Sequence, residues 1–357
     1  MENGIVNIAC GLAPRGIETY VACLERVGVF AVRLPVPENV RTLGKTGGFS
    51  PFAVLRLAML IAKLRPSVVH SHNLGPLIYA ALATLHGRTA PLVHGEHALL
   101  LPWEKAPRRL AQRRRYFRTC RAVHTVAPSM REELTALELK TRELLVIENG
   151  VDTERFVPTD RTDVRRALGI PVDALLLGLV GRFGPHKGHR TLLDAFDRLI
   201  EQHPRCALLL VGAGGSEETA IRERITASPH RERIFLAGFQ SNPIPYYQAL
   251  DLLVIPSTNE GMSNAALEAM ACGIPVLGNT GCGHESILAH GTDGFISDLS
   301  SADSVRRALD TLLHTPQRLV DTGARARTTV AHRFSLVRML DAYDHLYRSV
   351  ARAAWIS

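Results

Sequence analysis

Short apolar runs alternate with longer amphipathic stretches along the whole chain. Apolar runs bounded by Gly, Pro, Asn or Asp are typical of buried strands, and the stretches between them have helical spacing. The runs predicted to be strands are Ile5–Ala9, Val29–Val36, Val68–His70, Pro91–His94, Ala122–Val126 and Leu144–Ile147 in the first half, and Leu175–Val180, Ala207–Val211, Ile234–Ala237, Leu252–Ile255 and Ile274–Leu277 in the second. Strands that alternate with helices predict an α/β fold with parallel sheets. A length of 357 residues suggests about two domains.

The first predicted strand leads into a glycine-bearing turn. This turn, Gly11–Gly16, precedes a helix expected over Ile17–Val27. A glycine turn at a helix N-terminus suits a phosphate or a sugar that approaches the backbone. Gly16 is therefore a candidate backbone contact, and Arg15 is a candidate charge toward an anionic ligand. An ordinary strand-to-helix turn explains the same residues.

The stretch Pro256–Gly278 carries the strongest chemical signal in the chain. It follows an apolar strand and opens a helix that Ser263 or Asn264 can cap. Gly261 lets the backbone approach a ligand closely, and the positive end of the helix attracts an anion. The backbone amides expected to face that anion belong to Met262, Ser263, Asn264 and Ala265.

Two glutamates flank this helix start. Glu260 comes just before it, and Glu268 lies one turn after Asn264 on the same helix face. A carboxylate repels a phosphate but accepts hydrogen bonds from neutral hydroxyls. An anion between two hydroxyl-bearing groups describes a sugar nucleotide, with a hexose, a diphosphate and a ribose. Two solvated surface carboxylates are the plain alternative.

A second cluster of polar residues follows the strand Leu175–Val180. Gly181 opens a loop in which Arg182 and Lys187 stand five positions apart, and a helix follows. The planar fork of arginine and the point charge of lysine can together hold both phosphates of a diphosphate. Two surface cations are the alternative here.

The string E-G-M-S-N-A-A-L-E-A-M-A-C-G-I-P-V at 260–276 closely resembles the paired-glutamate motif of retaining glycosyltransferases with the GT-B fold, in particular of glycosyltransferase family 4. The resemblance implies that Glu260 binds hydroxyls of the donor sugar and that Glu268 binds the ribose. The loop after Val180 is similar to the G-R-x-x-x-x-K-G motif of the family, which assigns Arg182 and Lys187 to the donor diphosphate.

Further positions resemble the family more locally. His97 matches the donor-sugar histidine, and the loop that begins at Gly238 and Phe239 matches the segment that holds the base through backbone groups. Gly16 resembles one glycine of the glycine-rich first loop. The stretch between that loop and the next strand is shorter than is usual in the family, so a compressed or missing element is expected there.

The resemblance implies two Rossmann-like domains whose parallel sheets face each other across a cleft. The first, 1–152, is the acceptor side, and the second, 153–334, binds the nucleotide sugar. A C-terminal helix, 335–357, is expected to cross back to the first domain. The N-G-V-D turn at 149–152 resembles the interdomain linker of the family.

The net charge of +8 favours anionic partners. The most basic segment is a predicted helix without acidic residues over Pro107–Arg121, with arginines at Arg108, Arg109, Arg113, Arg114 and Arg115. Such a helix, with apolar neighbours, is typical of a membrane-surface or anionic-acceptor element. A solvated helix face remains the alternative. Nucleic acid is not expected as a partner, because no recognised nucleic-acid module accompanies the helix.

Several other classes are disfavoured by the sequence. The six cysteines are scattered and form no C-x-x-C pair, and His94 and His97 lack a third ligand at metal spacing, so no metal is expected. The G-x-G-x-x-G fingerprint of NAD sites is incomplete at Gly212–Gly215. Neither a signal peptide nor an apolar run long enough to span a bilayer is found. We expect a cytoplasmic protein that attaches peripherally to the inner membrane face.

These patterns together predict a retaining glycosyltransferase. It is expected to move a hexose or an N-acetylhexosamine from a UDP- or GDP-sugar to a hydroxyl in lipid-linked glycan, lipopolysaccharide or exopolysaccharide synthesis, without an obligatory cofactor. By family analogy, the leaving phosphate takes the acceptor proton. Two alternatives stay open: a sugar-nucleotide epimerase of the same fold, and a catalytically silent protein that binds carbohydrate or lipid.

Overall fold

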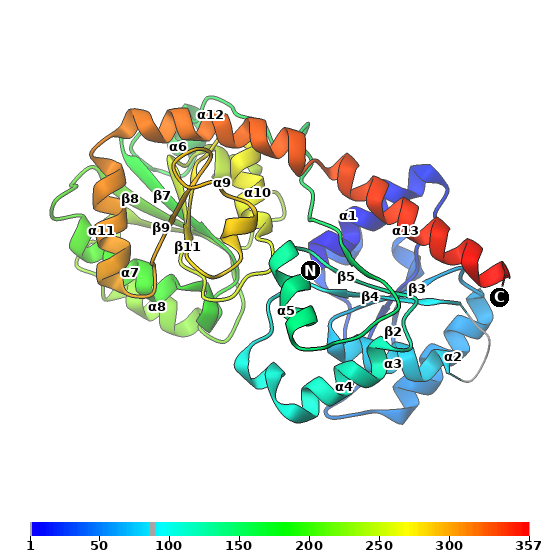
Figure 1. Cartoon of the computed structure of the whole chain (residues 1–357). Coiled ribbons are helices and arrows are strands. Elements are labelled where there is room, and N and C mark those ends of the chain that lie inside the picture. The colour runs from blue at the N-terminus through cyan, green and yellow to red at the C-terminus, as the bar shows by residue number, and fades with distance from the viewer. Residues whose placement is uncertain (1, 86–89, 357) are drawn as a thin grey trace. The chain divides into compact units, whose positions relative to one another are not determined.

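The computed structural model describes residues 2–85 and 90–356 and divides into two compact units (Figure 1). The first unit combines Met1–Asn149 with Val337–Ser357, and the second is Gly150–Leu336. All strand pairs within the described residues are parallel. The predicted α/β fold with parallel sheets is thus confirmed in both units.

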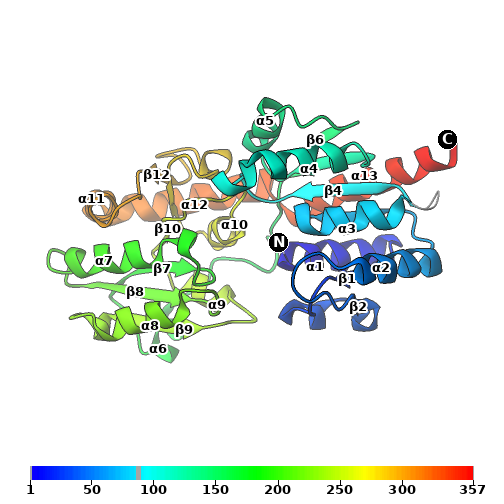
Figure 2. The same cartoon turned by 90° about the horizontal axis from the view of Figure 1, so that it is seen from below.

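The first unit holds two sheets, with strand orders β1-β2 and β3-β4-β5-β6. The strands are β1 (Val21–Cys23), β2 (Val40–Thr42), β3 (Val69–His72), β4 (Leu92–Glu96), β5 (Ala122–Thr125) and β6 (Leu144–Val146). The helices are α1 (Glu2–Leu12), α2 (Pro51–Leu64), α3 (Leu74–Thr84), α4 (Pro107–Phe117), α5 (Pro128–Ala136) and α13 (Leu336–Ile356), with 3-10 turns η1 (Ala13–Arg15), η2 (Val29–Arg33), η3 (Pro37–Asn39) and η4 (Pro102–Lys105). In Figure 2, α2 and α3 run side by side, and they share a core of apolar side chains.

The start of the chain differs from the prediction. Ile5–Ala9 is part of helix α1 rather than a strand, because Val6, Ala9 and Leu12 form one buried helical stripe. Gly11 packs against Leu340 of α13, which no local pattern reveals.

The next two predicted elements are also wrong. The predicted helix Ile17–Val27 contains strand β1, and the predicted strand Val29–Val36 begins as the 3-10 turn η2. A short apolar run reads equally well as a strand or as part of a buried helix, and tertiary packing decides between them.

The second unit is one six-stranded sheet with the order β12-β11-β10-β7-β8-β9. Its strands are β7 (Leu175–Val180), β8 (Cys206–Val211), β9 (Ile234–Gly238), β10 (Leu252–Ile255), β11 (Val276–Asn279) and β12 (Phe295–Ser297). Its helices are α6 (Thr162–Ala167), α7 (His189–Leu199), α8 (Glu218–Thr226), α9 (Ile244–Gln248), α10 (Asn264–Ala271), α11 (Ala302–Leu313) and α12 (Pro316–Arg333), with 3-10 turns η5 (Pro185–Lys187), η6 (Arg231–Arg233) and η7 (His284–Ser286). The strands predicted in this half are confirmed.

The strand order places a topological switch point between β7 and β10. From β7 the chain moves outward to β8 and β9 on one side, and β10 begins the outward series on the other side. In open parallel sheets, ligands bind at the carboxyl ends of the strands beside such a point. The loops after β7 and β10 are therefore expected to form a ligand-binding site. Among the described residues, no helix combines the length and the apolar character that crossing a membrane requires.

Candidate functional site

The loop after β7 is held against the loop after β10. The backbone of Gly188 has a φ of +73°, and a Cβ on it would lie 2.6 Å from the carbonyl oxygen of Pro256, so only glycine fits here without strain. The amide of Thr258 also donates to the carbonyl of His186 at 3.0 Å. Arg182 stands in the same loop and is exposed. The two loops thus form one framework at the switch point.

Lys187 and Glu260 meet across this framework. Lys187 Nζ donates to Glu260 Oε1 at 2.6 Å, and the Glu260 side chain is only 13% exposed. Gly283, with a φ of +90°, packs against the backbone of this loop, since a Cβ there would lie 2.8 Å from the carbonyl oxygens of Glu260 and Gly261. A cation that partly neutralises the carboxylate allows an anion and a hydroxyl to be bound next to each other.

Helix α10 begins where the sequence predicts. Ser263 is its N-cap, and the hydroxyl of Ser263 accepts the amide of Ala266 at 3.4 Å. The first amides of a helix have no acceptor within the helix, so those of Asn264 and Ala265 belong to the positive end of the dipole. Met262 precedes the cap and is buried. The structure brings this helix start and Glu260 onto one loop.

Glu268, on α10, is held by a residue that the sequence analysis missed. The hydroxyl of Tyr247 donates to Glu268 Oε2 at 2.8 Å. Tyr247 lies on α9 and is fully buried; burial and the adjacent Glu268 carboxylate raise the pKa of Tyr247 well above its usual value. The tyrosine therefore stays protonated and acts as a fixed donor. Nothing in the local sequence distinguishes Tyr247 from the neighbouring Tyr246.

The loops after β8 and β9 lie beside the loop after β7. The amide of Phe183 donates to the carbonyl of Gly214 at 2.9 Å, and the amide of Gly212 donates to the carbonyl of Gly238 at 2.8 Å. Gly238 ends β9, and the ring of Phe239 after it is 50% exposed. The exposed ring and the neighbouring backbone groups offer a flat apolar surface with hydrogen-bonding edges.

In the first unit, histidines gather at the carboxyl ends of β3, β4 and β5. His72 Nδ1 lies 2.8 Å from His97 Nε2, and His70 Nε2 lies 3.0 Å from His124 Nε2. The C-terminal helix α13 reaches this cluster, because the hydroxyl of Tyr347 lies 2.7 Å from His70 Nδ1. The sequence predicted a role for His97, whereas no sequence signal pointed to His124 or Tyr347.

Burial keeps these imidazoles neutral. Loss of hydration, reinforced by neighbouring histidines, lowers the pKa of His70, His72 and His97 well below the usual value, and burial lowers that of His124 to about 3. A neutral imidazole has one donor and one acceptor nitrogen, and both suit hydrogen bonding to hydroxyls. The cluster is therefore a set of uncharged polar groups at the ligand-binding edge of the sheet.

The basic helix α4 is not a uniform cationic surface, and this corrects the expectation for Arg113. The side chain of Arg113 is fully buried, with its Nε 2.9 Å from Glu96 Oε1 and its Nη2 3.0 Å from Glu104 Oε1. Burial raises the pKa of Glu96, but His94 and Arg113 together lower it by a larger amount, so the pKa of Glu96 lies below its usual value. Arg113 is thus a structural cation. The other predicted arginines of this helix, Arg108, Arg109, Arg114 and Arg115, are exposed.

The setting of Arg15 and Gly16 is also different from the prediction. Gly16 follows the helical turn η1 and leads toward strand β1. It therefore does not precede a helix N-terminus, which the predicted phosphate contact required. Arg15 forms an ion pair with Asp341 of α13 at 2.7 Å, and Arg348 of the same helix donates to its carbonyl at 3.1 Å. Arg15 thus serves the docking of α13.

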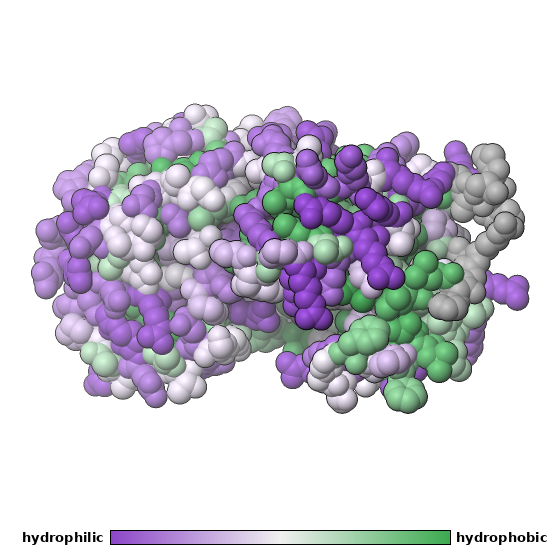
Figure 3. Space-filling view, turned by 60° about the horizontal axis from the view of Figure 1, so that its bottom comes forward, coloured by the Kyte–Doolittle hydropathy of each residue, from purple (hydrophilic) through white to green (hydrophobic). Residues whose placement is uncertain are grey.

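The apolar surface of the first unit lies on α2 instead. Phe52, Leu55 and Met59 recur at helical spacing and are 75%, 57% and 63% exposed. Phe49, just before the helix, is 59% exposed. Figure 3 shows hydrophobic side chains gathered on one part of the molecular surface. A contiguous exposed patch of this kind marks an interaction surface.

Two family profiles match the chain, and they meet close to the boundary between the two units. Residues 1–155 match the profile of Glycosyltransferase Family 4, and residues 160–329 match that of Glycosyl transferases group 1. The lipopolysaccharide core biosynthesis glycosyltransferase LpsE of Rhizobium meliloti (strain 1021) is 30% identical over 234 residues, which are 66% of this chain and 66% of the relative.

A second glycosyltransferase and a solved structure are also similar to this chain. The D-inositol 3-phosphate glycosyltransferase of Geodermatophilus obscurus is 30% identical over 286 residues, 77% of this chain and 62% of its own length. The chain therefore spans about two thirds of the length of each of these two relatives. The crystal structure of Anabaena Alr3699/HepE in complex with UDP-glucose has a TM-score of 0.83 at 21% identity and covers 98% of this chain and 95% of its own. This likeness shows the fold.

Proposed function

Because both halves of the chain belong to glycosyltransferase families of the GT-B type, we propose that the protein transfers a sugar from a nucleoside diphosphate sugar to an acceptor hydroxyl, with retention of anomeric configuration. The observation that carries the proposal is the framework at the switch point, where Lys187 and Glu260 meet at 2.6 Å beside the start of α10. This arrangement offers a cation and a helix dipole to a diphosphate and a carboxylate to hydroxyls.

Each residue of the second unit then has a distinct task. Arg182, Lys187 and the amides at 262–265 bind the diphosphate, and Gly181 lies beside them at the carboxyl end of β7. Glu260 accepts hydrogen bonds from sugar hydroxyls. Glu268, held by Tyr247, accepts them from the ribose. UDP and UDP-glucose are the first ligands to test, since the structural relative HepE is described in complex with both.

The chemical step needs no carboxylate nucleophile in this proposal. The bond between the anomeric carbon and the phosphate oxygen breaks while the acceptor oxygen bonds to the same carbon, and the acceptor proton passes to the leaving phosphate. Arg182, Lys187 and the helix start stabilise the negative charge that develops on that phosphate. Neutral His97 donates or accepts a hydrogen bond to a sugar hydroxyl, in keeping with its low pKa.

We further propose that the acceptor is carried by an anionic membrane and that α2 docks there. Between Glu38 and Glu96 the chain has no Asp or Glu, while Arg56, Lys63 and Arg65 flank the apolar face of α2. An amphipathic helix with an apolar face and flanking cations lies in the membrane interface, and the cations attract anionic headgroups. The exposed arginines of α4 are a secondary contribution.

The test is turnover of a panel of UDP- and GDP-sugars, with and without soluble hexose glycosides as acceptors. A transferase releases nucleoside diphosphate only with an acceptor, and the anomeric coupling constant of the product reports retention. An epimerase converts the donor sugar without any acceptor. A silent binding protein binds a donor in calorimetry but releases no nucleoside diphosphate. Turnover that is unchanged in Glu260→Ala, or a product of inverted configuration, overturns the proposal.

A further inference from the structure

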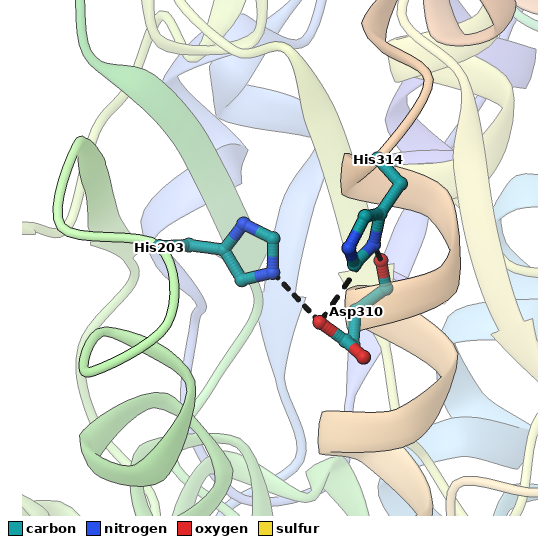
Figure 4. Close-up of side chains that lie close together, drawn as sticks. All are labelled: His203, Asp310 and His314. Atoms are coloured by element: carbon teal, nitrogen blue, oxygen red, sulfur yellow. Dashed lines mark hydrogen bonds and ion pairs between the residues drawn. The ribbon is translucent and has the colours of Figure 1, made fainter.

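We propose that His203, Asp310 and His314 form a binding site for a divalent transition-metal ion such as zinc. One ligand atom from each residue lies within 4.8 Å of the other two, and within the described residues this is the one group of three that meets this geometry. Figure 4 shows the three side chains turned toward one another, with Asp310 on α11, His314 at the C-terminal end of that helix and His203 on a neighbouring segment. His203 Nε2 lies 2.8 Å from Asp310 Oδ1.

Two of the ligands are fixed by the helix α11. Asp310 and His314 are four residues apart, which puts them on one helix face, and this is the spacing at which helices present paired metal ligands. His314 Nδ1 donates to the carbonyl of Asp310 at 2.6 Å. This bond sets the tautomer and leaves Nε2 as the ligand nitrogen.

The third ligand comes from the turn after α7. The amide of His203 donates to the carbonyl of Leu199 at 3.0 Å, and its own carbonyl accepts the amide of Cys206 at 2.9 Å. The turn is thus held on both sides of the histidine. Helices α7 and α11 pack through a shared core that includes Leu199, Leu309 and Leu313. Ligand positions on packed elements cost little to organise.

The ligand set selects the type of ion. Zinc binds nitrogen and carboxylate oxygen at about 2.0–2.2 Å, so tetrahedral ligand atoms stand roughly 3.3–3.5 Å apart. His203 Nε2 lies 2.8 Å from Asp310 Oδ1, so these two atoms have to move slightly apart, and the imidazole of His314, whose side chain is 67% exposed, has to turn its Nε2 toward them. Two imidazoles suit zinc, nickel or copper, whereas magnesium and calcium prefer oxygen ligands throughout. The exposure leaves a fourth position for water.

The site lies at the amino ends of the strands, whereas the residues assigned to the sugar nucleotide lie at their carboxyl ends. His203 precedes the amino end of β8, while Arg182 follows the carboxyl end of its parallel neighbour β7. The six residues of β8 extend over roughly 20 Å, at about 3.3 Å per residue, and this length separates the two ends of the strands. The ion therefore joins α7 to α11 and does not act on the substrate, and transfer is expected to persist in EDTA.

Calorimetry of the full chain with zinc chloride, after chelator treatment and dialysis, tests the site. The wild type is expected to bind one more equivalent of zinc than His314→Ala, or to bind that equivalent at least about tenfold more tightly. His332→Ala, which removes another exposed histidine on α12, is the matched control and should bind as the wild type does.

Thermal unfolding with and without zinc gives an independent readout. Zinc should raise the Tm of the wild type and of His332→Ala by more than that of His314→Ala or Asp310→Asn, because an ion that binds only the folded state stabilises it. Comparison with His314→Ala separates this site from the histidines of the first unit. Equal zinc stoichiometry, affinity and Tm shift in the wild type and His314→Ala overturn the proposal.

Discussion

Lys187 and Glu260 form an ion pair that joins the loops after β7 and β10, with Nζ 2.6 Å from Oε1. The pair sits at the point where the strand order of the sheet reverses. It places one positive and one negative group side by side, beside a helix start. Lys187 is expected to bind the diphosphate of the donor, and Glu260 is expected to bind hydroxyls of its sugar.

Lys187→Ala should weaken the binding of the nucleoside diphosphate. Loss of one charged hydrogen bond costs about 1.5–3 kcal/mol, which corresponds to roughly 10- to 100-fold in Kd. Isothermal titration with UDP and GDP measures the change. Arg190→Ala is the matched control, because it removes an exposed cation three residues further along the chain. Equal losses in both variants would show a general effect of charge rather than a specific contact.

Tyr247→Phe should weaken donor binding through Glu268. Glu268→Ala is expected to cost about 1.5–3 kcal/mol, or about 10- to 100-fold in donor affinity, by removing a charged bond to ribose. Tyr247→Phe should cost less, because it only frees the carboxylate to move. The double variant should resemble Glu268→Ala alone, since the tyrosine acts through the glutamate. Tyr246→Phe is the control, and strictly additive losses would contradict the coupling.

Arg113→Ala should destabilise the fold strongly. It leaves Glu96 buried without its partner, and breaking a buried ion pair in this way costs roughly 3–5 kcal/mol. Chemical denaturation measures the free energy of unfolding. Arg108→Ala, on the exposed face of the same helix, should change it by less than about 0.5 kcal/mol. Similar stabilities for the two variants would contradict the structural role of Arg113.

Stability should fall in acid because of the buried histidines. Burial lowers the pKa of His124 from 6.5 to about 3, so the unfolded chain takes up a proton first as the pH drops. Between these two values the unfolded state binds more protons, and each pH unit removes up to about 1.4 kcal/mol per histidine. Denaturation midpoints measured from about pH 7.5 to about pH 5 test the slope.

A pair of variants assigns that slope to the cluster. His124→Gln should make the decline shallower, because one histidine that resists protonation is gone. His345→Gln, on the exposed side of α13, should leave the slope unchanged. A wild-type midpoint that does not move over this range would show that the histidines protonate in the folded state.

Replacing the apolar face of α2 should reduce membrane binding. Phe52→Ser, Leu55→Ser and Met59→Ser combined should lower co-sedimentation with vesicles of anionic phospholipid, while Val320→Ser on α12 removes an equally exposed apolar side chain and should not. Lys63→Glu and Arg65→Glu should each weaken binding at least about fivefold, since a cation near the surface contributes about 1 kcal/mol. Binding that is insensitive to all five changes would place the contact elsewhere.

Local sequence pointed to the candidate site residues Arg182, Lys187, Glu260 and Glu268 of the second unit, but not to Tyr247. A buried strand, a glycine loop and a capped helix occur in direct succession around Arg182 and around Glu260, so their order alone predicts a ligand-binding edge. Ser263 was recognisable as a cap because capping is a contact within four residues. Features that depend on neighbours in the chain were therefore predictable.

The start of the chain shows why other features were not. The run Ile5–Ala9 fits a strand or a buried helix, and only packing of α1 against η2 and α13 decides for the helix. The same holds for Arg113, which shares its composition with the exposed arginines beside it but meets Glu96 and Glu104 inside the unit. Burial is a property of the assembled fold, not of the local pattern.

The sequence by itself determined the α/β class and the polar groups at the strand ends, because both follow from local periodicity and turn chemistry. The tertiary structure decided which of these groups are held and by what. Tyr247 orients Glu268, which is 21 positions away in the sequence, and Tyr347 contacts His70, which is 277 positions away. Such long-range contacts arise only when the helices pack on the sheet, since no local signal fixes which side chains will meet there.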